Sequence, residues 1–233
     1  NLFVCDHDRH AVLIVDPNGR TEIFADQAAS YPLPLPNFCA FDAAGHLYVS
    51  SSTGPETISA ADLLAHPRPI GQLFRFAPSG EGTLVADGLE FPNGIALTPD
   101  ESAVYVLQSG PWNAVRVPIG SDRGLPSQRE VASEKFSGLP DGLAFDQAGN
   151  AVVTLVMAPR DGRLRGLHRL ITLRPDGTTE ALAEDPTGKT LALPTNCAYG
   201  GPDLRTLYVA SLKANHFAVL DVEVPGHPLY HQR

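Results

Sequence analysis

Length, composition and charge already exclude several classes of protein. The chain has 233 residues, of which 43% are hydrophobic and 18% are charged, so it is neither disordered nor too short for a large core. The formal net charge is −9, and Lys and Arg form no cluster along the sequence, which argues against nucleic-acid binding. No apolar run approaches the ~20 residues of a membrane-spanning helix. We therefore expect neither a nucleic acid nor a membrane as a partner.

The three cysteines do not suggest a disulfide framework. They are Cys5, Cys39 and Cys197, and an odd, small number of cysteines is typical of a reducing compartment. Cys39 and Cys197 lie in apolar segments, where a cysteine most often serves as a small buried hydrophobic residue. We predict a cytoplasmic location on this basis.

In chain order, short apolar segments separated by turn-forming residues predict many β-strands. Residues 2–6 have the pattern of the second strand of a repeating unit, and turns are expected at 16–19, 78–80 and 175–177. The single helical pattern, residues 59–66, begins with Ser59 as N-cap and ends before Pro67. Strands are predicted at residues 38–42, 46–52, 72–78 and 82–89, then at 94–99, 103–109, 113–119 and about 129–136, then at 142–146, 151–156, 167–173 and 178–184.

Four segments of the chain open in the same way, each with a polar residue followed by an apolar strand. Aligned on Ala40, Ala96, Ala144 and Ala198, they place Asn37, Asn93, Asp141 and Thr195 in one column. These positions are 56, 48 and 54 residues apart (37 to 93, 93 to 141, 141 to 195). A period of this size fits the ~40 to 50 residues of a β-propeller blade.

The repeat therefore predicts an all-β protein, a β-propeller of four-stranded blades in a single domain, residues 1–233. Because the first unit lacks its first strand and the last unit lacks its fourth, the ring does not close on the residues present. We expect a six-bladed β-propeller that here lacks about the first blade. A five-bladed ring is the alternative.

The polar column predicts a ligand site at one mouth of the central channel, because the first strand of each blade lines that channel. One carboxylate with amide and hydroxyl oxygens is a set of ligands that suits a hard cation such as Ca²⁺. Each residue taken alone has a simpler interpretation, since Asn and Asp often cap their own backbone at a turn. The alignment of all four favours the site.

Two motifs in the column carry a family resemblance. The segments Phe91-Pro92-Asn93-Gly94 and Leu139-Pro140-Asp141-Gly142, with the Gly200–Leu204 and Leu207–Val209 stretches near the end, resemble the gluconolactonase, regucalcin (senescence marker protein) and luciferin-regenerating-enzyme-like family. The resemblance covers essentially the whole chain. It implies a six-bladed propeller that hydrolyses sugar lactones with one divalent cation in the channel, most simply Ca²⁺, with Zn²⁺, Mn²⁺ or Mg²⁺ as alternatives.

The resemblance also implies roles for individual residues. Asn93 and Asp141 are the expected metal ligands, and Asp141 is in addition the expected catalytic base. Asn37 matches a position that contacts substrate or metal-bound water, and we add Thr195 and Trp112 as candidate substrate-binding residues. The family's remaining ligand, a Glu near its N-terminus, has no counterpart in this sequence. The predicted activity is that of a carboxylic-ester hydrolase acting on a small sugar lactone.

Other functions stay open at this point. One is a non-catalytic propeller that binds a ligand or a protein and keeps the cation for structure, and another is a propeller like strictosidine synthase. His7 and His10 suggest a histidine-based lactonase, but neither lies in the column. Further polar residues follow the second strands and are interpreted as solvated loops, with one or two of them able to contact a sugar: residues 6–9, 50–53, 108–109 and 213–216. Glu56 is a candidate lid residue in the longest insertion.

Overall fold

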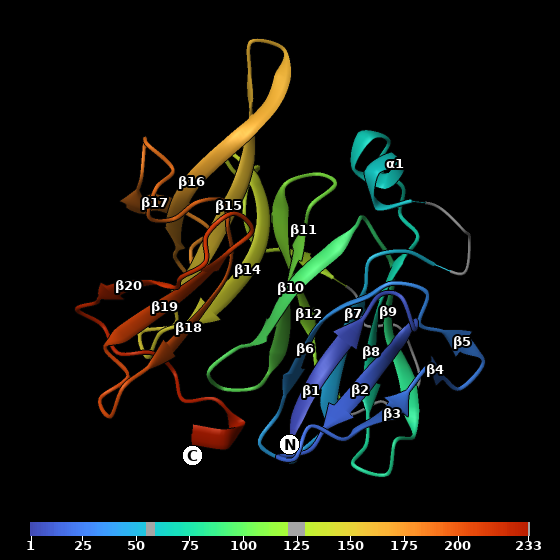
Figure 1. Cartoon of the computed structure of the whole chain (residues 1–233). Helices are drawn as coiled ribbons and strands as arrows, with labels where there is room; N and C mark the ends of the chain where they lie inside the picture. Colours follow the sequence, from blue (N-terminus) through green and yellow to red (C-terminus); the bar gives the residue numbers. More distant parts are fainter. Residues whose placement is uncertain (55–58, 121–128, 233) are drawn as a thin grey trace.

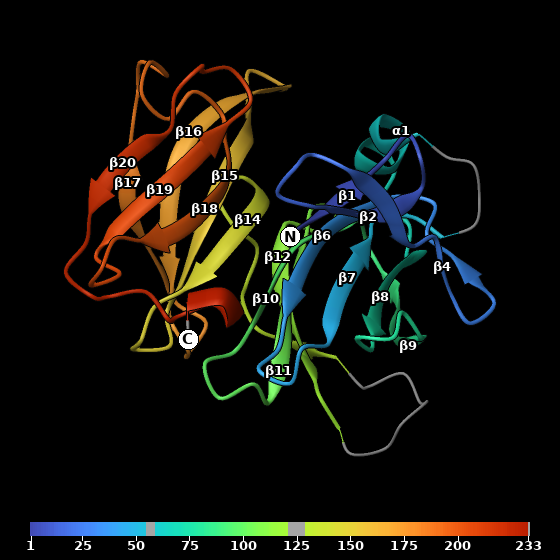
Figure 2. The same ribbon diagram turned by 60° about the horizontal axis from the view of Figure 1, so that its bottom comes forward.

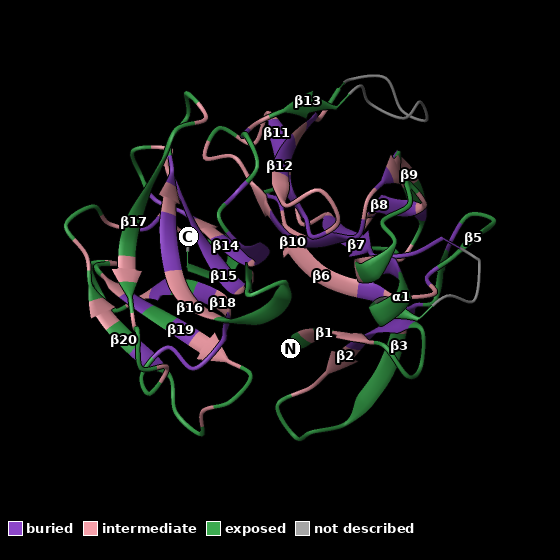
Figure 3. Ribbon diagram, turned by 90° about the horizontal axis from the view of Figure 1, so that it is seen from above, coloured by how far each residue is buried: buried purple, intermediate pink, exposed green. Residues whose placement is uncertain are grey.

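The computed structural model describes residues 1–54, 59–120 and 129–232 of the chain, and these residues form five β-sheets of three or four strands around a common centre (Figure 3). Every neighbouring pair of strands in these sheets is antiparallel, in the order of the sequence. The three-stranded first sheet consists of β1 (Leu2–Asp6), β2 (Ala11–Val15) and β3 (Thr21–Ala25). A hairpin of β4 (Gln27–Ala28) and β5 (Tyr31–Pro32) follows it.

Three four-stranded sheets come next, and the fifth sheet again has three strands. The second sheet contains β6 (Pro36–Phe41), β7 (Leu47–Ser51), β8 (Gly71–Phe76) and β9 (Gly82–Leu89). The third contains β10 (Pro92–Leu97), β11 (Ala103–Gln108), β12 (Asn113–Pro118) and β13 (Glu130–Val131). The fourth contains β14 (Leu139–Phe145), β15 (Ala151–Arg160), β16 (Arg163–Leu173) and β17 (Thr179–Glu184). The fifth contains β18 (Pro194–Gly200), β19 (Thr206–Ser211) and β20 (Ala218–Asp221).

The hydrophobic core lies between adjacent sheets. Separate clusters of buried residues join the first sheet to the second, the second to the third, the third to the fourth and the fourth to the fifth. Because side chains alternate across a strand, each sheet can present one apolar face to the sheet before it and the other to the sheet after it. This is the packing of a β-propeller, as the sequence predicts.

The number of sheets differs from the prediction of six four-stranded blades. The described residues form five blade-like sheets, of which three have four strands and two have three strands. Among these residues, no core cluster joins the fifth sheet to the first. Apolar side chains on the two sheets that flank this open side are exposed, at 69% for Leu2, 57% for Val219 and 42% for Tyr208. The ring formed by the described residues is therefore open between the fifth sheet and the first.

The first strand holds the place of a second strand, as its sequence pattern predicts. Sγ of Cys39 in β6 contacts the carbonyl oxygen of Phe3 in β1 at 3.9 Å. At the other end of the chain, Sγ of Cys197 in β18 contacts the carbonyl oxygen of Val152 in β15 at 3.7 Å. Because β15 is the second strand of its sheet, β1 occupies the equivalent position relative to its neighbour.

The local predictions also hold for the helix and the turns. Helix α1 (Ala60–Ala65) begins after Ser59, whose Oγ accepts a hydrogen bond from the Asp62 amide, and ends at His66. Gly19, Gly80 and Gly177 occupy the left-handed positions of the three predicted turns, with φ between 83° and 86°. The sequence did not predict the length of β15 and β16, whose outer halves form a hairpin that projects from the ring (Figure 1).

The C-terminal segment crosses the end of the ring opposite to this hairpin and to α1 (Figure 1). The His227 amide donates a hydrogen bond to the carbonyl of Phe145, and Nε2 of Gln232 donates to the carbonyl of Tyr199. Tyr230 lies in the short 3₁₀ helix Tyr230–Gln232, and its ring stacks on the ring of Phe41 with 5.4 Å between the two ring centres. The segment thus connects the second, fourth and fifth sheets at one mouth of the channel.

Candidate functional site

The four column residues lie at the start of the four consecutive inner strands β6, β10, β14 and β18. Each of these strands contacts the next along the ring, and Figures 2 and 3 show them side by side near the centre. All four residues are preceded by a proline: Pro36, Pro92, Pro140 and Pro194. The structure therefore brings Asn37, Asn93, Asp141 and Thr195 to the same mouth of the channel, opposite to the mouth that the C-terminal segment crosses.

Within the column, a side-chain hydrogen bond joins Asn93 to Asp141. The Asn93 side chain, only 7% exposed, donates a hydrogen bond to the Asp141 carboxylate on the neighbouring strand. No ion pair to Asp141 is found among the described residues. Burial raises the pKa of Asp141 to about 7, and the hydrogen bond from Asn93 opposes this shift only in part. The Asp141 carboxyl group is thus buried at the channel mouth with a raised pKa.

The glycines of the Pro-Asn-Gly and Pro-Asp-Gly motifs allow the inner strands to approach one another closely. A Cβ atom at Gly94 would lie 2.4 Å from the Asp141 carbonyl oxygen, and one at Gly142 would lie 2.6 Å from the Thr195 carbonyl oxygen. Neither glycine has a positive φ, so close approach of the backbones, rather than a turn, requires them. The motif and the spacing of the site thus have one physical cause.

Two serines that follow second strands hold the two asparagines. Nδ2 of Asn37 donates to Ser52 Oγ at 2.9 Å, and Nδ2 of Asn93 donates to Ser109 Oγ at 3.1 Å. Both serines have 0% exposure, and the whole of residues 50–53 and 108–109 is buried, although the sequence pattern predicts solvated loops there. That interpretation is wrong because the ends of β7 and β11 pack against the neighbouring inner strand. Their spacing of 15 and 16 residues from the asparagines is the signal that could have revealed them.

An apolar wall and two projecting elements surround the same mouth. Leu139, Val156 and Leu193 form a buried cluster against which Leu64 of α1 and Trp112 pack. The Trp112 ring, predicted to bind substrate, is partly buried and has the Lys135 ammonium 5.0 Å from its centre. Helix α1 and the β15–β16 hairpin rise on this side of the ring (Figure 1).

The remaining polar candidates lie outside the column. His7 and His10 are exposed, and Nδ1 of His10 contacts the Pro34 carbonyl at 2.6 Å. The exposed positions of residues 7–9, 213 and 216 agree with their interpretation as solvated loops. Glu56 lies outside the described residues.

The column fits a hard cation better than a transition metal. In the described parts of the chain, no group of three or more His, Cys, Asp and Glu side chains is placed to hold a metal ion. A cation would therefore be bound by one carboxylate together with amide, hydroxyl and backbone oxygens, which is a donor set of the Ca²⁺ type. The buried Asp141 carboxylate, with an amide as its described partner, is the group that a cation would neutralise.

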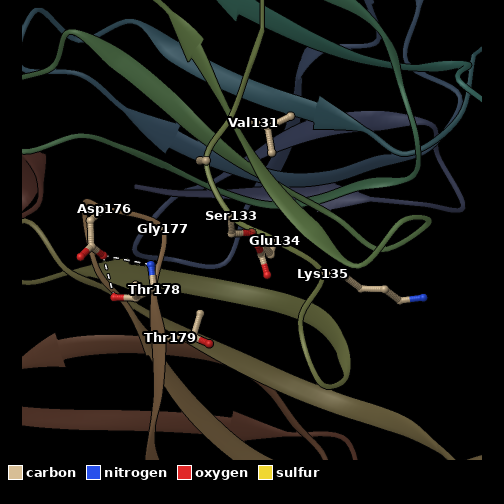
Figure 4. Close-up of a pocket in the computed structure, with 9 residues that line it drawn as sticks. Val131, Ser133, Glu134, Lys135, Asp176, Gly177, Thr178 and Thr179 are labelled. Carbon is tan, nitrogen blue, oxygen red and sulfur yellow. Dashed lines mark hydrogen bonds between the residues drawn. The ribbon is translucent and has the colours of Figure 1, made fainter.

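A hollow lies on the outer edge of the ring, and none of the column residues lines it. This groove, of about 530 Å³, lies between Val131–Lys135 and the turn Asp176–Thr179 (Figure 4). Oδ1 of Asp176 accepts hydrogen bonds from the amide and the hydroxyl of Thr178. Lys135 points away from Asp176 in Figure 4, and its ammonium group lies 5.0 Å from the centre of the Trp112 ring. The carboxylate therefore stabilises its own turn.

Fold and site together define a β-propeller with an oxygen-rich site at one mouth of its channel. The sequence matches the SMP-30/gluconolactonase/LRE-like region over residues 1–213, and the chain belongs to this family. Among the described residues, no helix is long and apolar enough to cross a membrane.

Several curated relatives are named as lactonases. The chain is 28% identical to the gluconolactonase of Zymomonas mobilis over 221 residues, which cover 90% of this chain and 57% of that protein. It is 34% identical to the 6-deoxy-6-sulfogluconolactonase of Pseudomonas putida over 151 residues, covering 64% and 47% of the two chains. The chain thus spans about half the length of these curated relatives.

Solved structures share the fold. A putative gluconolactonase superimposes with a TM-score of 0.72 at 23% identity, covering 96% of this chain and 71% of the other. A calcium-binding regucalcin from Agrobacterium tumefaciens gives a TM-score of 0.70 at 21% identity, with 98% and 75% covered.

Proposed function

We propose that this protein hydrolyses a sugar lactone at the channel mouth formed by β6, β10, β14 and β18, as a carboxylic-ester hydrolase of the gluconolactonase type. The observation that carries the proposal is the hydrogen-bonded pair Asn93 and Asp141 on adjacent inner strands, with a pKa of about 7 for the carboxyl group when no cation is bound. A general base is most effective when its pKa lies near the working pH. The lactonase names of the curated relatives support the choice of substrate.

In this proposal, Asp141 removes a proton from the water that attacks the lactone carbonyl carbon. The ring C–O bond then breaks, and the ring oxygen takes up a proton to give the hydroxy acid. Asn93 donates a hydrogen bond to Asp141 and so holds the carboxylate in place. Asn37 and Thr195 contact the substrate oxygens and hydroxyl groups from the flanking strands.

Asn93 and Asp141 would also hold one divalent cation, with Ca²⁺ as the first candidate and Zn²⁺, Mn²⁺ or Mg²⁺ as alternatives. When bound, such a cation would polarise the lactone carbonyl and lower the pKa of a water molecule. The regucalcin neighbour is named as calcium-binding, which supports the choice of Ca²⁺.

The wall beside the column would exclude bulk water from the reacting groups. Leu139, Val156 and Leu193 are each less than 9% exposed, and Trp112 extends the wall toward α1. An aromatic ring at this position can stack on a sugar, which is the role that we propose for Trp112.

The test uses two aspartates of the same strand region. Asp141→Asn should reduce lactone turnover at least about 100-fold, within the range expected for loss of a general base. Asp146→Asn is the matched control, because buried Asp146 only accepts hydrogen bonds from its own turn at the other mouth. Turnover of gluconolactone and of pentonolactones is followed with a pH indicator, with and without chelator and against the spontaneous rate.

The expected pattern is loss of turnover without loss of folding for Asp141→Asn, whereas Asp146→Asn should keep turnover even if its turn becomes less stable. Turnover that survives in Asp141→Asn would sink the catalytic assignment. A wild-type rate that equals the spontaneous rate, with cation binding intact, would favour a non-catalytic binding propeller.

The six-sheet ring belongs to the same proposal. Both sheets at the open side expose apolar side chains, namely Leu2, Val4, Tyr208 and Val219. These side chains support a further sheet between the fifth sheet and the first, which would cover them. The protein should therefore bind an apolar dye, and Val4→Ser and Val219→Ser should reduce that binding. Unchanged dye binding in such variants would count against a sixth sheet.

The compartment is likewise a proposal. The chain has three cysteines, Cys5, Cys39 and Cys197, and this odd, small number does not suggest a disulfide framework. This supports a reducing compartment such as the cytoplasm.

A further inference from the structure

Two buried serines connect the site asparagines to the backbone of the next sheet in the same way. Nδ2 of Asn37 donates to Ser52 Oγ at 2.9 Å, and Ser52 Oγ donates to the Pro92 carbonyl at 2.8 Å. One sheet further on, Nδ2 of Asn93 donates to Ser109 Oγ at 3.1 Å, and Ser109 Oγ donates to the Pro140 carbonyl at 2.8 Å. Each chain of hydrogen bonds ends on the proline directly before the next column residue.

The direction of these hydrogen bonds follows from chemistry. A serine hydroxyl has one hydrogen, and a carbonyl oxygen can only accept. Because the hydrogens of Ser52 and Ser109 are used on proline carbonyls, the two hydroxyl oxygens can only accept from the asparagines. Each asparagine must therefore turn its NH₂ group toward the serine.

This arrangement leaves the amide oxygens free of the serine contacts. The second N–H of Asn93 faces the Asp141 carboxylate, which accepts from it. Within the parts of the chain that the structure describes, no donor is hydrogen-bonded to Oδ1 of Asn37 or Asn93. The column thus offers amide oxygens and carboxylate oxygens, all of them acceptors, to a ligand in the channel.

The other two column positions have no such serine. The strand pairing places Val156 and Leu212 where Ser52 and Ser109 stand in the earlier sheets. A carboxylate has two equivalent acceptor oxygens, and a threonine hydroxyl rotates freely, so neither needs a partner to choose its orientation. The serines occur only where the column residue is an amide, whose two ends differ.

We propose that Ser52 and Ser109 are positioning residues, which fix the amide orientation of Asn37 and Asn93 so that both present oxygen to a cation or to donor groups of the substrate. The nature of the ligand rests on the proposed function, whereas the amide orientation rests on the hydrogen bonds alone. Loss of a residue that orients a metal ligand typically lowers metal affinity 10- to 100-fold.

The experiment compares Ser109→Ala and Ser52→Ala with Ser50→Ala. Ser50 is a matched control, because it is equally buried and its Oγ donates to the backbone carbonyl of Asn93 at 2.7 Å without contacting the side chain. Ca²⁺ affinity is measured by calorimetry on the chelator-treated protein. Side-chain amide signals of the asparagines are recorded by NMR, and KM and kcat are measured on gluconolactone.

We expect Ser109→Ala to weaken Ca²⁺ binding about 10- to 100-fold and Ser52→Ala to raise KM with kcat retained. Both should shift the amide signal of their own asparagine and speed its hydrogen exchange, whereas Ser50→Ala should leave both asparagine signals in place. The proposal is overturned if the amide signals do not respond, or if Ser50→Ala changes Ca²⁺ affinity as much as Ser109→Ala does. If the wild-type protein neither binds Ca²⁺ nor hydrolyses a lactone while the amide signals still respond, the proposed function fails and the positioning role stands.

Discussion

Asn93 and Asp141, 48 residues apart in the sequence, share a hydrogen bond between the first strands of adjacent sheets. The bond joins a buried amide to a carboxyl group whose pKa is raised to about 7 by burial. Gly94 makes the approach possible, because a Cβ atom there would overlap the Asp141 backbone. The pair shows how the repeat of the fold assembles a chemical site from single residues of different sheets.

Replacing Asp141 by Asn should stabilise the cation-free protein at neutral and alkaline pH. The folded-state pKa of about 7 lies above the ordinary value of 3.8, so the folded protein keeps a proton that the unfolded chain releases. The stability that this proton contributes is complete below pH ~4 and is lost as the pH rises through 7. The variant should therefore exceed the wild type by about 2–4 kcal/mol above pH 7.

The measurement is urea unfolding of both proteins between pH 4 and pH 8 in the presence of chelator. The difference in unfolding free energy should grow from pH 4 to pH 7 and then stay constant. A difference that does not change with pH would mean that Asp141 titrates normally in the folded protein.

Cation binding should depend on pH through the same group. A protonated carboxyl group does not bind a cation, so Ca²⁺ affinity should fall about tenfold for each pH unit below 7. Calorimetric titrations at pH 5, 6, 7 and 8 would show this slope, together with proton release on binding near neutral pH. Asp141→Asn is the control that should remove the slope, and a wild-type affinity that is flat from pH 5 to pH 8 would exclude Asp141 as a ligand.

Gly142→Ala should disturb the column by steric overlap. The added Cβ would lie 2.6 Å from both the Thr195 carbonyl oxygen and Oδ1 of Asn196, which the neighbouring backbone cannot easily avoid. We expect a loss of about 2–3 kcal/mol in unfolding free energy together with weaker Ca²⁺ binding. Gly19→Ala is the comparison, because its Cβ would meet no atom within 4 Å and only its φ of +83° is unfavourable.

For Gly19→Ala the expected loss is about 1 kcal/mol, with Ca²⁺ binding unchanged. Thermal and urea unfolding give the stability of both variants, and calorimetry gives the affinity. If Gly142→Ala binds Ca²⁺ as the wild type does, close approach of β14 and β18 is not needed for the site.

Mild oxidation should join Cys5 to Cys39 across the first sheet boundary. Their thiols are hydrogen-bonded, which raises the pKa of Cys5, with burial adding to the effect, and lowers that of Cys39. Treatment with diamide should convert the two thiols into a disulfide, the diamide being reduced to its hydrazine form. Closing a loop of about 35 residues in this way should stabilise the protein by about 3–4 kcal/mol.

Peptide mapping and thiol counting would detect the crosslink. Cys197 is the internal control, since it is buried against the Val152 carbonyl and should keep its thiol. Retention of three free thiols under diamide would show that β1 and β6 hold the two sulfur atoms in an unsuitable geometry.

Much of the local structure could be predicted from particular residues. Ser59 begins α1, the glycines at 19, 80 and 177 form the turns, and the pattern of residues 2–6 places β1 as a second strand. These features depend on neighbours in the sequence, through capping, backbone conformation and side-chain alternation. The burial of Ser52 and Ser109 cannot be predicted in this way, because a polar residue at a strand end has the same local pattern whether it is solvated or covered by the next sheet.

The repeat, the all-β class and the column of Asn37, Asn93, Asp141 and Thr195 can be predicted without a structure, because period and residue type can be read along one chain. Three features emerge only in the folded protein: five sheets form with an open side, Ser52 and Ser109 accept hydrogen bonds from the two amides, and burial raises the pKa of Asp141 to about 7. Each of these depends on contacts between sheets, and such contacts are set by how close neighbouring backbones come, which no local pattern contains.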